Sequence, residues 1–230
     1  MIVETFEQGS GAWLRARLGI PTASMFSNIV TSTGMPCKGV GRANYMRDLC
    51  LERLTGRMLD HFVSPAMERG TMLEPQARAW YELQTGREVQ EVGMVFNDAR
   101  TCAGSPDGLC HDRGIEIKCP EGRQMLSILI RGSMPADYGS QVQGGMWLTG
   151  LKSWDFVAYT DDCLPSVIWT VEASDKWQDC ADVEIPRFCA ELDAMEAMLR
   201  ESYDWPAPAP VDVEQDSIDF LDMCAGSGTI

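Results

Sequence analysis

The sequence lacks the features of a membrane or secreted protein. None of its apolar runs approaches the roughly 20 residues that a membrane-spanning helix needs. The acidic first residues, Met1 to Glu7, have neither the basic nor the apolar region of a signal peptide. The 9 cysteines include no pair spaced Cys-x-x-Cys, which argues against zinc and disulfide frameworks. We therefore expect a cytoplasmic protein with free thiols.

Basic residues are also scarce, which at first sight disfavours a nucleic-acid partner. The chain has 19 Lys and Arg against 34 Asp and Glu, a net charge of −15. The excess is confined to residues 161–230, which hold 17 acidic and 3 basic side chains, whereas residues 1–160 hold 17 and 16. DNA binding by the first 160 residues is therefore not excluded, and it would rest on a local, salt-sensitive basic patch. The acidic remainder would keep one face off DNA or meet a partner.

The length and composition indicate one globular domain followed by a tail. A chain of 230 residues with 45% apolar content can bury a full core. Pro206 to Pro210 alternates proline and alanine, which favours a stiff extended linker. We expect a single domain over residues 1–205, then the linker and an acidic tail over 206–230. Within the tail, residues 218–221 are either plain flexible chain or a short docking motif.

Residues with chemical potential concentrate between Gly104 and Pro120. Ser105-Pro106-Asp107-Gly108 is typical of a turn, because Pro presets φ, Asp caps its own backbone and Gly accepts a positive φ. After a second turn, residues 115–118 read Ile-Glu-Ile-Lys, the alternation of a strand with one buried face. We expect Glu116 and Lys118 to point outward on the other face.

Asp107 and these two side chains can then converge on one metal-bound water. The alternative is a plain hairpin turn beside a solvated ion pair on a strand. Carboxylate oxygens suit Mg²⁺ or Mn²⁺ in the first case.

Apolar periodicity and stop signals predict the remaining elements. Helices are expected over 10–18, directly after Thr22–Ser24, and over 44–55, 66–86, 135–149 and 182–200; strands over 89–96, 101–103, 154–160 and 166–171. Pro75 is tolerated only in a first helical turn, which places Glu74 near a helix start, where it could simply complement the dipole. Residues 31–44 are rich in loop formers and would carry Lys38 and Arg42 on a surface loop, either mobile or lying on a DNA backbone.

Five segments in order resemble the phage lambda exonuclease family of viral recombination (alkaline) exonucleases, within the PD-(D/E)xK nuclease superfamily. They are Trp13-Leu14-x-x-Arg17-Leu18-Gly19-x-x-Thr22-Ala23-Ser24, Gly70-x-x-x-Glu74-x-x-Ala77-Arg78, Gly104-Ser105-Pro106-Asp107-Gly108-Leu109, Ile115-Glu116-Ile117-Lys118-Cys119-Pro120 and Gln141-Val142-Gln143-x-x-Met146-Trp147. The resemblance covers about residues 11 to 150, and no motif matches beyond about residue 175.

The resemblance implies an α/β (α+β) restriction-endonuclease-like core, a mixed central sheet flanked by helices. It implies 5′-to-3′ digestion of one strand of duplex DNA ends, leaving 3′ single strands for recombination. It also implies a ring-shaped homotrimer and a single-strand annealing protein as partner. Two other classes stay open: another nuclease of the superfamily, restriction-type or RecB-like, and a non-catalytic DNA-binding protein on a decayed nuclease fold. No membrane partner is expected.

We assign the candidate site residues with the family in view. Asp107, Glu116 and the Ile117 carbonyl would hold a first Mg²⁺, and Glu74 with Asp107 a second; Mn²⁺ may substitute. Lys118 would orient the attacking water, stabilise developing negative charge, or accept a proton if its pKa is lowered. By the family match, Gln143 is a fifth catalytic residue that orients lysine, water or phosphate; otherwise it is an ordinary hydrogen-bonding amide.

A terminal phosphate is the obvious handle for an exonuclease that starts at 5′ ends. Arg17, Ser24 and Ser105 are the candidates, because Arg makes two-pronged phosphate contacts and the serines lie at turns. Otherwise Arg17 pairs with a surface acid and the serines cap backbone. Met67 is either a core residue or, by the resemblance, an apolar wedge at the DNA end. With Lys38 and Arg42 it completes the candidate DNA contacts.

Overall fold

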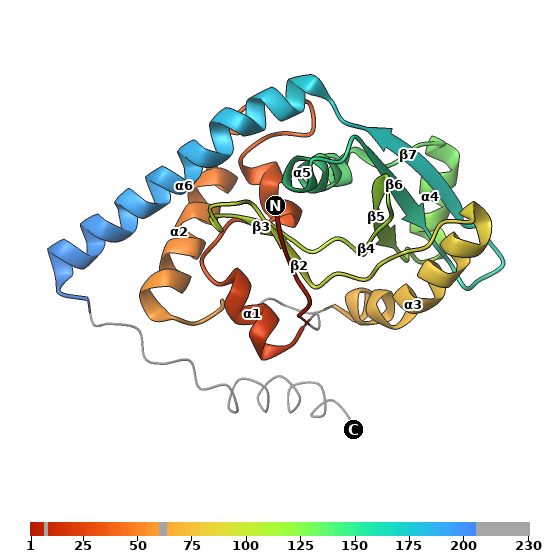
Figure 1. Cartoon of the computed structure of the whole chain (residues 1–230), viewed down its shortest axis with the longest axis horizontal. Helices are drawn as coiled ribbons and strands as arrows, with labels where there is room; N and C mark the ends of the chain where they lie inside the picture. The colour runs from red at the N-terminus through yellow and green to blue at the C-terminus, as the bar shows by residue number, and fades with distance from the viewer. Residues whose placement is uncertain (7–8, 60–63, 206–230) are drawn as a thin grey trace.

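The structure is a computed structural model, described here for residues 1–6, 9–59 and 64–205. The expected linker and tail, 206–230, lie outside these residues. The predicted mixed α/β fold is confirmed (Figure 1). No helix in the described ranges is long and apolar enough to cross a bilayer. The cysteines in those ranges carry free thiols.

The central sheet has four strands in the order β4-β5-β6-β7. They are β4 (Gly108–Leu109), β5 (Arg113–Lys118), β6 (Ser153–Ala158) and β7 (Val167–Glu172). β5 and β6 are parallel, and the two outer pairings are antiparallel, so the sheet is mixed. A smaller antiparallel sheet joins β1 (Ile2–Glu4), β2 (Met94–Phe96) and β3 (Ala103–Gly104).

Six α-helices and two short 3-10 helices are described. They are α1 (Gly11–Arg17), η1 (Ala23–Asn28), α2 (Val40–Thr55), α3 (Pro65–Thr85), α4 (Gly122–Arg131), η2 (Ala136–Tyr138), α5 (Gly139–Thr149) and α6 (Asp175–Tyr203). In Figure 1, α6 runs along one side of the molecule beside α2, while α3, α4 and α5 surround the central sheet.

The two faces of the central sheet are covered by different helices. Ala77 and Tyr81 of α3 pack with Ile115 and Ile117, on the face opposite Glu116. Met125 and Ile128 of α4 pack instead with Phe156 and Ala158. Register pairs Glu116 with Phe156 and Lys118 with Ala158, and paired residues share a face. The side chains of Glu116 and Lys118 therefore point into the layer under α4 and α5.

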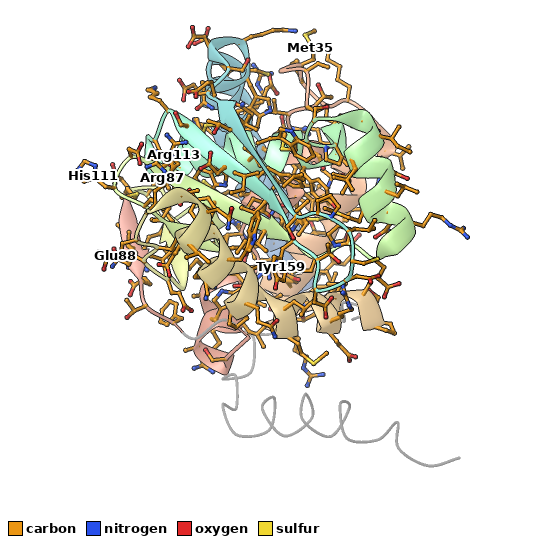
Figure 2. All side chains as sticks on the ribbon, turned by 90° about the vertical axis from the view of Figure 1, so that its right-hand side faces the viewer. Met35, Arg87, Glu88, His111, Arg113 and Tyr159 are labelled. Atoms are coloured by element: carbon orange, nitrogen blue, oxygen red, sulfur yellow. The ribbon has the colours of Figure 1, made fainter. Side chains whose placement is uncertain are left out.

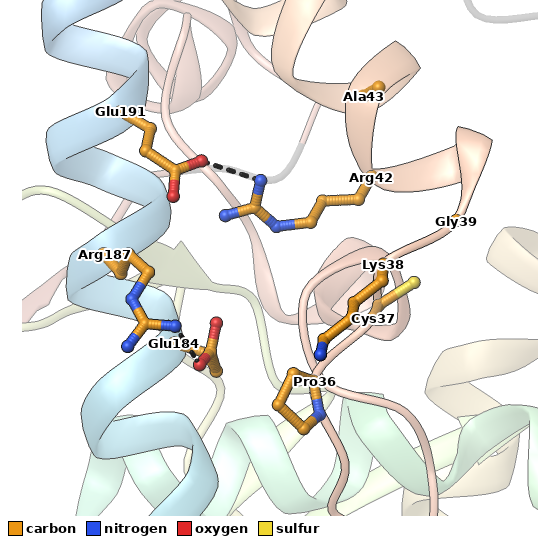
Figure 3. Close-up of a pocket in the computed structure, with 9 residues that line it drawn as sticks. All are labelled: Pro36, Cys37, Lys38, Gly39, Arg42, Ala43, Glu184, Arg187 and Glu191. Carbon is orange, nitrogen blue, oxygen red and sulfur yellow. Dashed lines mark hydrogen bonds and ion pairs between the residues drawn. The ribbon is translucent and has the colours of Figure 1, made fainter.

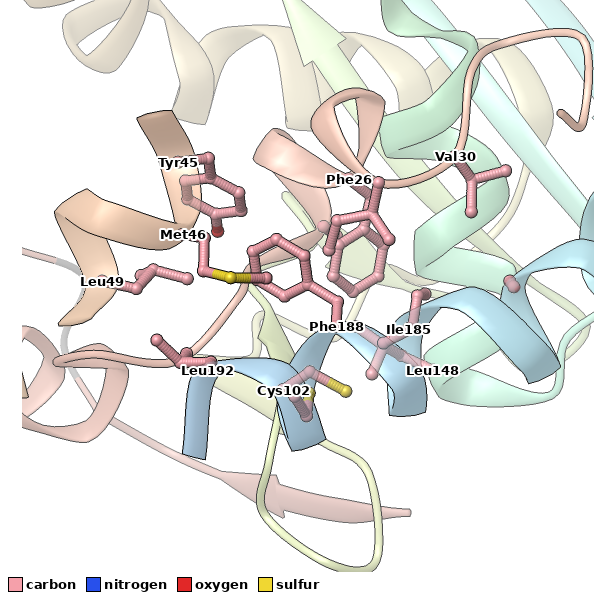
Figure 4. Packing of buried hydrophobic residues seen from close by; sticks show 14 of the residues in the cluster. Phe26, Val30, Tyr45, Met46, Leu49, Cys102, Leu148, Ile185, Phe188 and Leu192 are labelled. Atoms are coloured by element: carbon pink, nitrogen blue, oxygen red, sulfur yellow. The ribbon is translucent and has the colours of Figure 1, made fainter. Parts of the chain in front are cut away.

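The largest apolar cluster lies between α2, η1 and α6 (Figure 4). Phe26 and Phe188 are fully buried in it, and Tyr45 stacks on Phe188 with ring centroids 5.7 Å apart. A Cβ on Gly144 would lie 2.5 Å from the Phe26 ring, so only glycine lets η1 lie this close to α5. This packing fixes the η1 segment against the sheet layer.

Three expectations about elements are corrected. α3 begins after its cap Ser64 and runs through Pro75, so Glu74 lies in the middle of the helix. Pro75 leaves the carbonyl of Thr71 without its helical donor, but both residues are exposed, and water can satisfy that carbonyl. α2 begins at Val40, which places Arg42 on a helix and not in the loop. After Thr22 the chain forms a 3-10 helix without a side-chain cap.

Candidate active site

A cavity of about 290 Å³ brings the two predicted groups of site residues together. Its lining includes the candidate phosphate ligands and the candidate catalytic residues, namely Arg17, Ser24, Ser105, Asp107, Glu116 and Lys118. The first three come from α1, η1 and the turn before β4; the others come from that turn and from β5. We call Glu74, Asp107, Glu116 and Lys118 the acidic cluster, and Trp13, Arg17, Ser24 and Ser105 the arginine pocket.

Glu116 is buried at 3% exposure, so the expected outward orientation does not lead to solvent. Its Oε1 lies 2.6 Å from the ammonium of Lys118 and accepts a second hydrogen bond, also of 2.6 Å, from the amide of Gln141. Burial alone would lower the pKa of Lys118, but the charges of Glu116 and Asp107 outweigh it and raise that pKa. Lys118 is therefore held as a cation, which suits charge stabilisation and not proton acceptance.

The turn before β4 leaves one backbone carbonyl of β5 without a strand partner. Register pairs Gly108 with Ile115, so the next such position places Pro106 opposite Ile117. Proline has no N–H, and it cannot donate to the Ile117 carbonyl. The Ile117 N–H is instead taken by Oδ2 of Asp107 at 2.6 Å. Since N–H and C=O of one strand residue point the same way, this carbonyl is directed to the Asp107 side of β5.

Burial and neighbouring carboxylates raise the pKa of two members of the acidic cluster, Asp107 and Glu74. The pKa of Asp107 lies well above its usual range because of burial first, and then because of the charges of Glu116 and Glu74. The pKa of Glu74 is raised by burial, with contributions from Glu91 and Glu116. A bound cation would relieve both effects.

The donor set fits a hard divalent cation, although the side chains are engaged by protein cations. Within the described chain, no three His, Cys, Asp or Glu side chains form a cluster that could hold a metal. Glu116 is paired with Lys118, and Glu74 with Arg78 at 2.6 Å. Two carboxylates and the Ile117 carbonyl are nevertheless all oxygen donors, the class that Mg²⁺ and Mn²⁺ prefer.

The arginine pocket holds a cation that has no counter-ion among the residues the structure describes. The Arg17 guanidinium lies 4.5 Å from the centroid of the Trp13 ring, and burial lowers its pKa. It forms no ion pair with any residue that the structure describes. The alternative in which Arg17 pairs with a surface acid is therefore not seen there. An unpaired, partly desolvated guanidinium is a good anion ligand.

The two serines of this pocket differ in what they bind. The Ser105 hydroxyl donates to the Gly93 carbonyl at 2.9 Å and accepts from the Trp13 indole at 3.0 Å. The exposed Ser24 hydroxyl lies 3.3 Å from that of Thr22 and caps no helix. Trp13 thus contacts both Arg17 and Ser105, a link that no motif spacing revealed.

Gln143 is not brought to the acidic cluster, and Gln141 takes that place. The Gln143 amide donates to the Glu172 carbonyl at 2.8 Å and accepts from the Ser174 N–H at 2.9 Å. Residues two apart on a helix face roughly opposite sides, so one of the two glutamines reaches Glu116 and the other cannot. Both lie in the Gln-x-Gln motif, and that motif was the only signal that could have found Gln141.

Met67 and Tyr138 also lie near the candidate site residues. Met67 is 55% exposed and lines the cavity, so it is not a core residue. The ring centroid of Tyr138 lies 5.3 Å from the Lys118 ammonium. His111 is exposed and projects from the turn between β4 and β5 (Figure 2).

Lys38 and Arg42 line a different cavity, of about 390 Å³, between the start of α2 and α6 (Figure 3). Arg42 pairs there with Glu191 at 2.8 Å, and Arg187 with Glu184 at 2.6 Å. Lys38 is exposed. These bases are therefore separate from the acidic cluster and are partly neutralised by α6.

Comparison with known proteins identifies a matching family and similar solved structures. The model of the YqaJ-like viral recombinase domain matches residues 12–152. The crystal structure of an alkaline exonuclease, LHK-Exo from Laribacter hongkongensis, matches with 36% identity and a TM-score of 0.75, covering 84% of this chain and 97% of that one. A structure of LHK-Exo with dAMP matches equally well.

A phage-related exonuclease from Haemophilus somnus 129PT is similar in fold, with a TM-score of 0.61 and 16% identity over 80% of this chain and 97% of that one. Among curated proteins, none matches.

Proposed function

The chain belongs to the family of YqaJ-like viral recombinase domains, and on this premise we propose that it is a metal-dependent exonuclease acting from 5′ to 3′ on one strand of linear duplex DNA. Its product would be 3′ single-stranded ends for homologous recombination of the phage type. The observation that supports this most is that Asp107, Glu116 and Lys118 line the same cavity as Arg17, which forms no ion pair among the described residues. One part suits phosphodiester hydrolysis, and the other suits a terminal phosphate.

The acidic cluster would hold the cofactor. Asp107, Glu116 and the Ile117 carbonyl would bind one Mg²⁺, or Mn²⁺ in its place, and Glu74 with Asp107 would bind another. Bound cations of this kind lower the pKa of an attacking water and offset charge on the phosphate.

Lys118 would act on the reacting groups, and Gln141 would act on the metal ligand Glu116. Lys118 is a cation and donates hydrogen bonds to the water or to a phosphate oxygen, stabilising the negative charge that develops. Gln141 holds Glu116 in its orientation from α5, so the carboxylate keeps its place when Lys118 turns toward substrate. Burial of Glu116 excludes bulk water, which strengthens these interactions.

The arginine pocket would set the direction of digestion. Arg17 would grip a 5′-terminal phosphate in a two-pronged contact, with Ser24 and Ser105 as further ligands. Ser105 would have to turn its hydroxyl from Gly93 to the phosphate. Because Ser105 stands two residues before Asp107, a phosphate bound there would lie close to the scissile bond.

The other contacts and partners follow from the family. Met67, exposed at the cavity, would serve as an apolar wedge at the DNA end, and Lys38 and Arg42 would lie along the duplex backbone. A homotrimeric ring and a single-strand annealing protein complete the proposal.

Digestion of end-labelled linear duplex, with and without Mg²⁺, tests the activity. We expect nucleotides to be released from 5′ ends only when Mg²⁺ is present, and a covalently closed plasmid to stay intact. Cutting of the plasmid would show an endonuclease instead. Binding of DNA without any release of nucleotides would show a non-catalytic protein.

A further inference from the structure

Arg78 contacts three separate segments of the chain with one guanidinium. Its Nε–H donates to the main-chain carbonyl of Asp107 at 3.1 Å. One terminal nitrogen donates to Oε1 of Glu74 at 2.6 Å, and the other lies 2.8 Å from a carboxylate oxygen of Glu91. The side chain of Arg78 is only 12% exposed. None of the proposed steps so far uses it.

The planar guanidinium fixes the relative positions of its partners, because its donors point in set directions. Glu74 and Arg78 stand one turn apart on α3, whereas Asp107 belongs to the turn before β4. α3 packs on the face of the sheet opposite Glu116. A contact between α3 and this turn is therefore needed to keep the Glu74 carboxylate at a fixed position relative to Asp107. Within the described chain, Arg78 makes such a contact.

We propose that Arg78 is a positioning residue for the metal ligands, holding Glu74 and the main chain of Asp107 in the arrangement that binds two divalent cations. The inference rests on the proposed function. Arg78 acts through these ligands and touches neither substrate nor cation. Asp107 is then fixed at both ends, since its carboxylate is held by the Ile117 N–H and its carbonyl by Arg78.

Two effects of Arg78 on metal binding oppose each other. Its charge competes with a cation for Glu74, whereas its contacts hold both ligands in place. The second effect is the larger, because Arg78 bonds one oxygen of Glu74 and leaves Oε2 without a protein partner among the described residues. Its contact with Asp107 goes to the carbonyl and competes with no carboxylate oxygen. Removal of Arg78 therefore weakens metal binding.

The test is calorimetric titration of the full chain with Mn²⁺ in the absence of DNA, with melting temperatures measured in parallel. We expect Arg78→Ala to weaken Mn²⁺ binding about 10-fold or more, the size typical of residues that orient metal ligands. Arg78→Lys should recover part of the affinity, because lysine can pair with Glu74 but cannot also reach Asp107. Arg87→Ala, which removes an arginine just beyond α3 that lies 3.5 Å from Asp112, is the matched control and should bind like wild type.

Equal or tighter Mn²⁺ binding by Arg78→Ala, even with a lowered melting temperature, would overturn the inference. If that variant fails to fold, Arg78→Lys decides, and wild-type affinity in it overturns the inference equally. Wild type that binds no Mn²⁺ and releases no nucleotides would instead refute the proposed function. Wild type that does both, with Arg78→Ala binding normally, refutes the role of Arg78 alone.

Discussion

Asp107, Glu116 and Lys118 of the acidic cluster line the same cavity as the arginine pocket, whereas Glu74 is not in its lining. The acidic cluster and the arginine pocket differ in how their charges are matched. In the acidic cluster every carboxylate has a partner: Glu116 has Lys118 and Gln141, Glu74 has Arg78, and Asp107 has the Ile117 N–H. In the arginine pocket Arg17 has only the ring of Trp13, within the described chain. Each carboxylate of the acidic cluster thus has a hydrogen-bond or ion-pair partner before a ligand arrives, whereas Arg17 has no counter-ion among the described residues and its charge is left for the ligand.

On the proposed function, the acidic cluster carries out hydrolysis and the arginine pocket recognises the DNA end. A substitution in the acidic cluster should remove the reaction while leaving DNA affinity in place, because binding of the duplex rests elsewhere. A substitution in the arginine pocket should change which ends are digested. Arg17 is partly buried and has no counter-ion among the described residues, which is costly for a charge, so we interpret its state as preparation for an anion.

The largest effect is expected for Glu116→Gln. The change keeps the size of the side chain and removes the charge of a metal ligand, so nucleotide release should fall by about 10³-fold or more. DNA binding, measured by gel shift, should be unchanged. Glu184→Gln is the control, since Glu184 is also buried and paired, with Arg187, but lies outside this cavity. Ordinary activity of Glu116→Gln at saturating Mg²⁺ would contradict the metal assignment.

A smaller effect should follow from Arg17→Ala. Loss of charge-assisted hydrogen bonds to a phosphate should slow digestion of 5′-phosphorylated duplex by about 10- to 100-fold. It should also remove most of the preference over 5′-hydroxyl ends, whereas a 3′ phosphate should make no difference. Rates on matched duplexes give the measurement, with Arg15→Ala on the same helix as control. If wild type digests both 5′ ends equally, the pocket has another use.

The two glutamines of α5 offer a paired prediction. Gln141→Ala should lower the rate of release by about 10-fold, because Glu116 loses an orienting contact, and should leave the melting temperature unchanged. Gln143→Ala should do the reverse. Its loss leaves hydrogen bonds to the Glu172 carbonyl and Ser174 N–H unmade, which lowers the free energy of unfolding by about 1–3 kcal/mol. The opposite pattern would restore Gln143 to the site.

The smallest effect is expected from deletion of residues 207–230. This acidic segment contains none of the site residues, so the rate on naked DNA should change by less than about twofold, as is usual for terminal segments that hold no part of a site. A steady-state assay on linear duplex measures it, with the melting temperature as the check on folding. A large loss of rate with normal folding would place the tail in the active particle.

The alternation of residues 115–118 was enough to predict which side chains share a face, because a strand has a period of two. It could not show that Glu116 is buried. That depends on α4 and α5 covering the face, and their position comes from contacts far along the chain. The order of the motifs likewise indicated which residues belong together. Only the tertiary structure shows that candidates on α1, η1, the turn before β4 and β5 line one cavity, and that Glu74 and Gln143 are not in its lining.

That Gln141, and not Gln143, contacts Glu116 could not be predicted for a similar reason. A surface helix shows one apolar stripe, from which its orientation can be inferred. α5 is enclosed instead, and its buried residues include both polar and apolar ones on several sides. Nothing in its pattern distinguishes the side that meets Glu116. The helix start inferred from Pro75 was wrong for another reason. A helix tolerates an interior proline when the carbonyl that loses its donor, here that of Thr71, is exposed to water.

Because Pro106 lies opposite Ile117, the Ile117 amide can serve as a spectroscopic probe of the acidic cluster. The Ile117 amide proton is bonded to a carboxylate oxygen of Asp107 and not to a neighbouring strand. Its chemical shift and its rate of exchange with deuterium therefore follow the charge on that oxygen. The Cys110 amide is a reference nearby, because it donates to the Arg113 carbonyl across the turn between β4 and β5 and not to a carboxylate. In an amide spectrum of the protein, one resonance can thus report the arrival of a cation before any DNA is added.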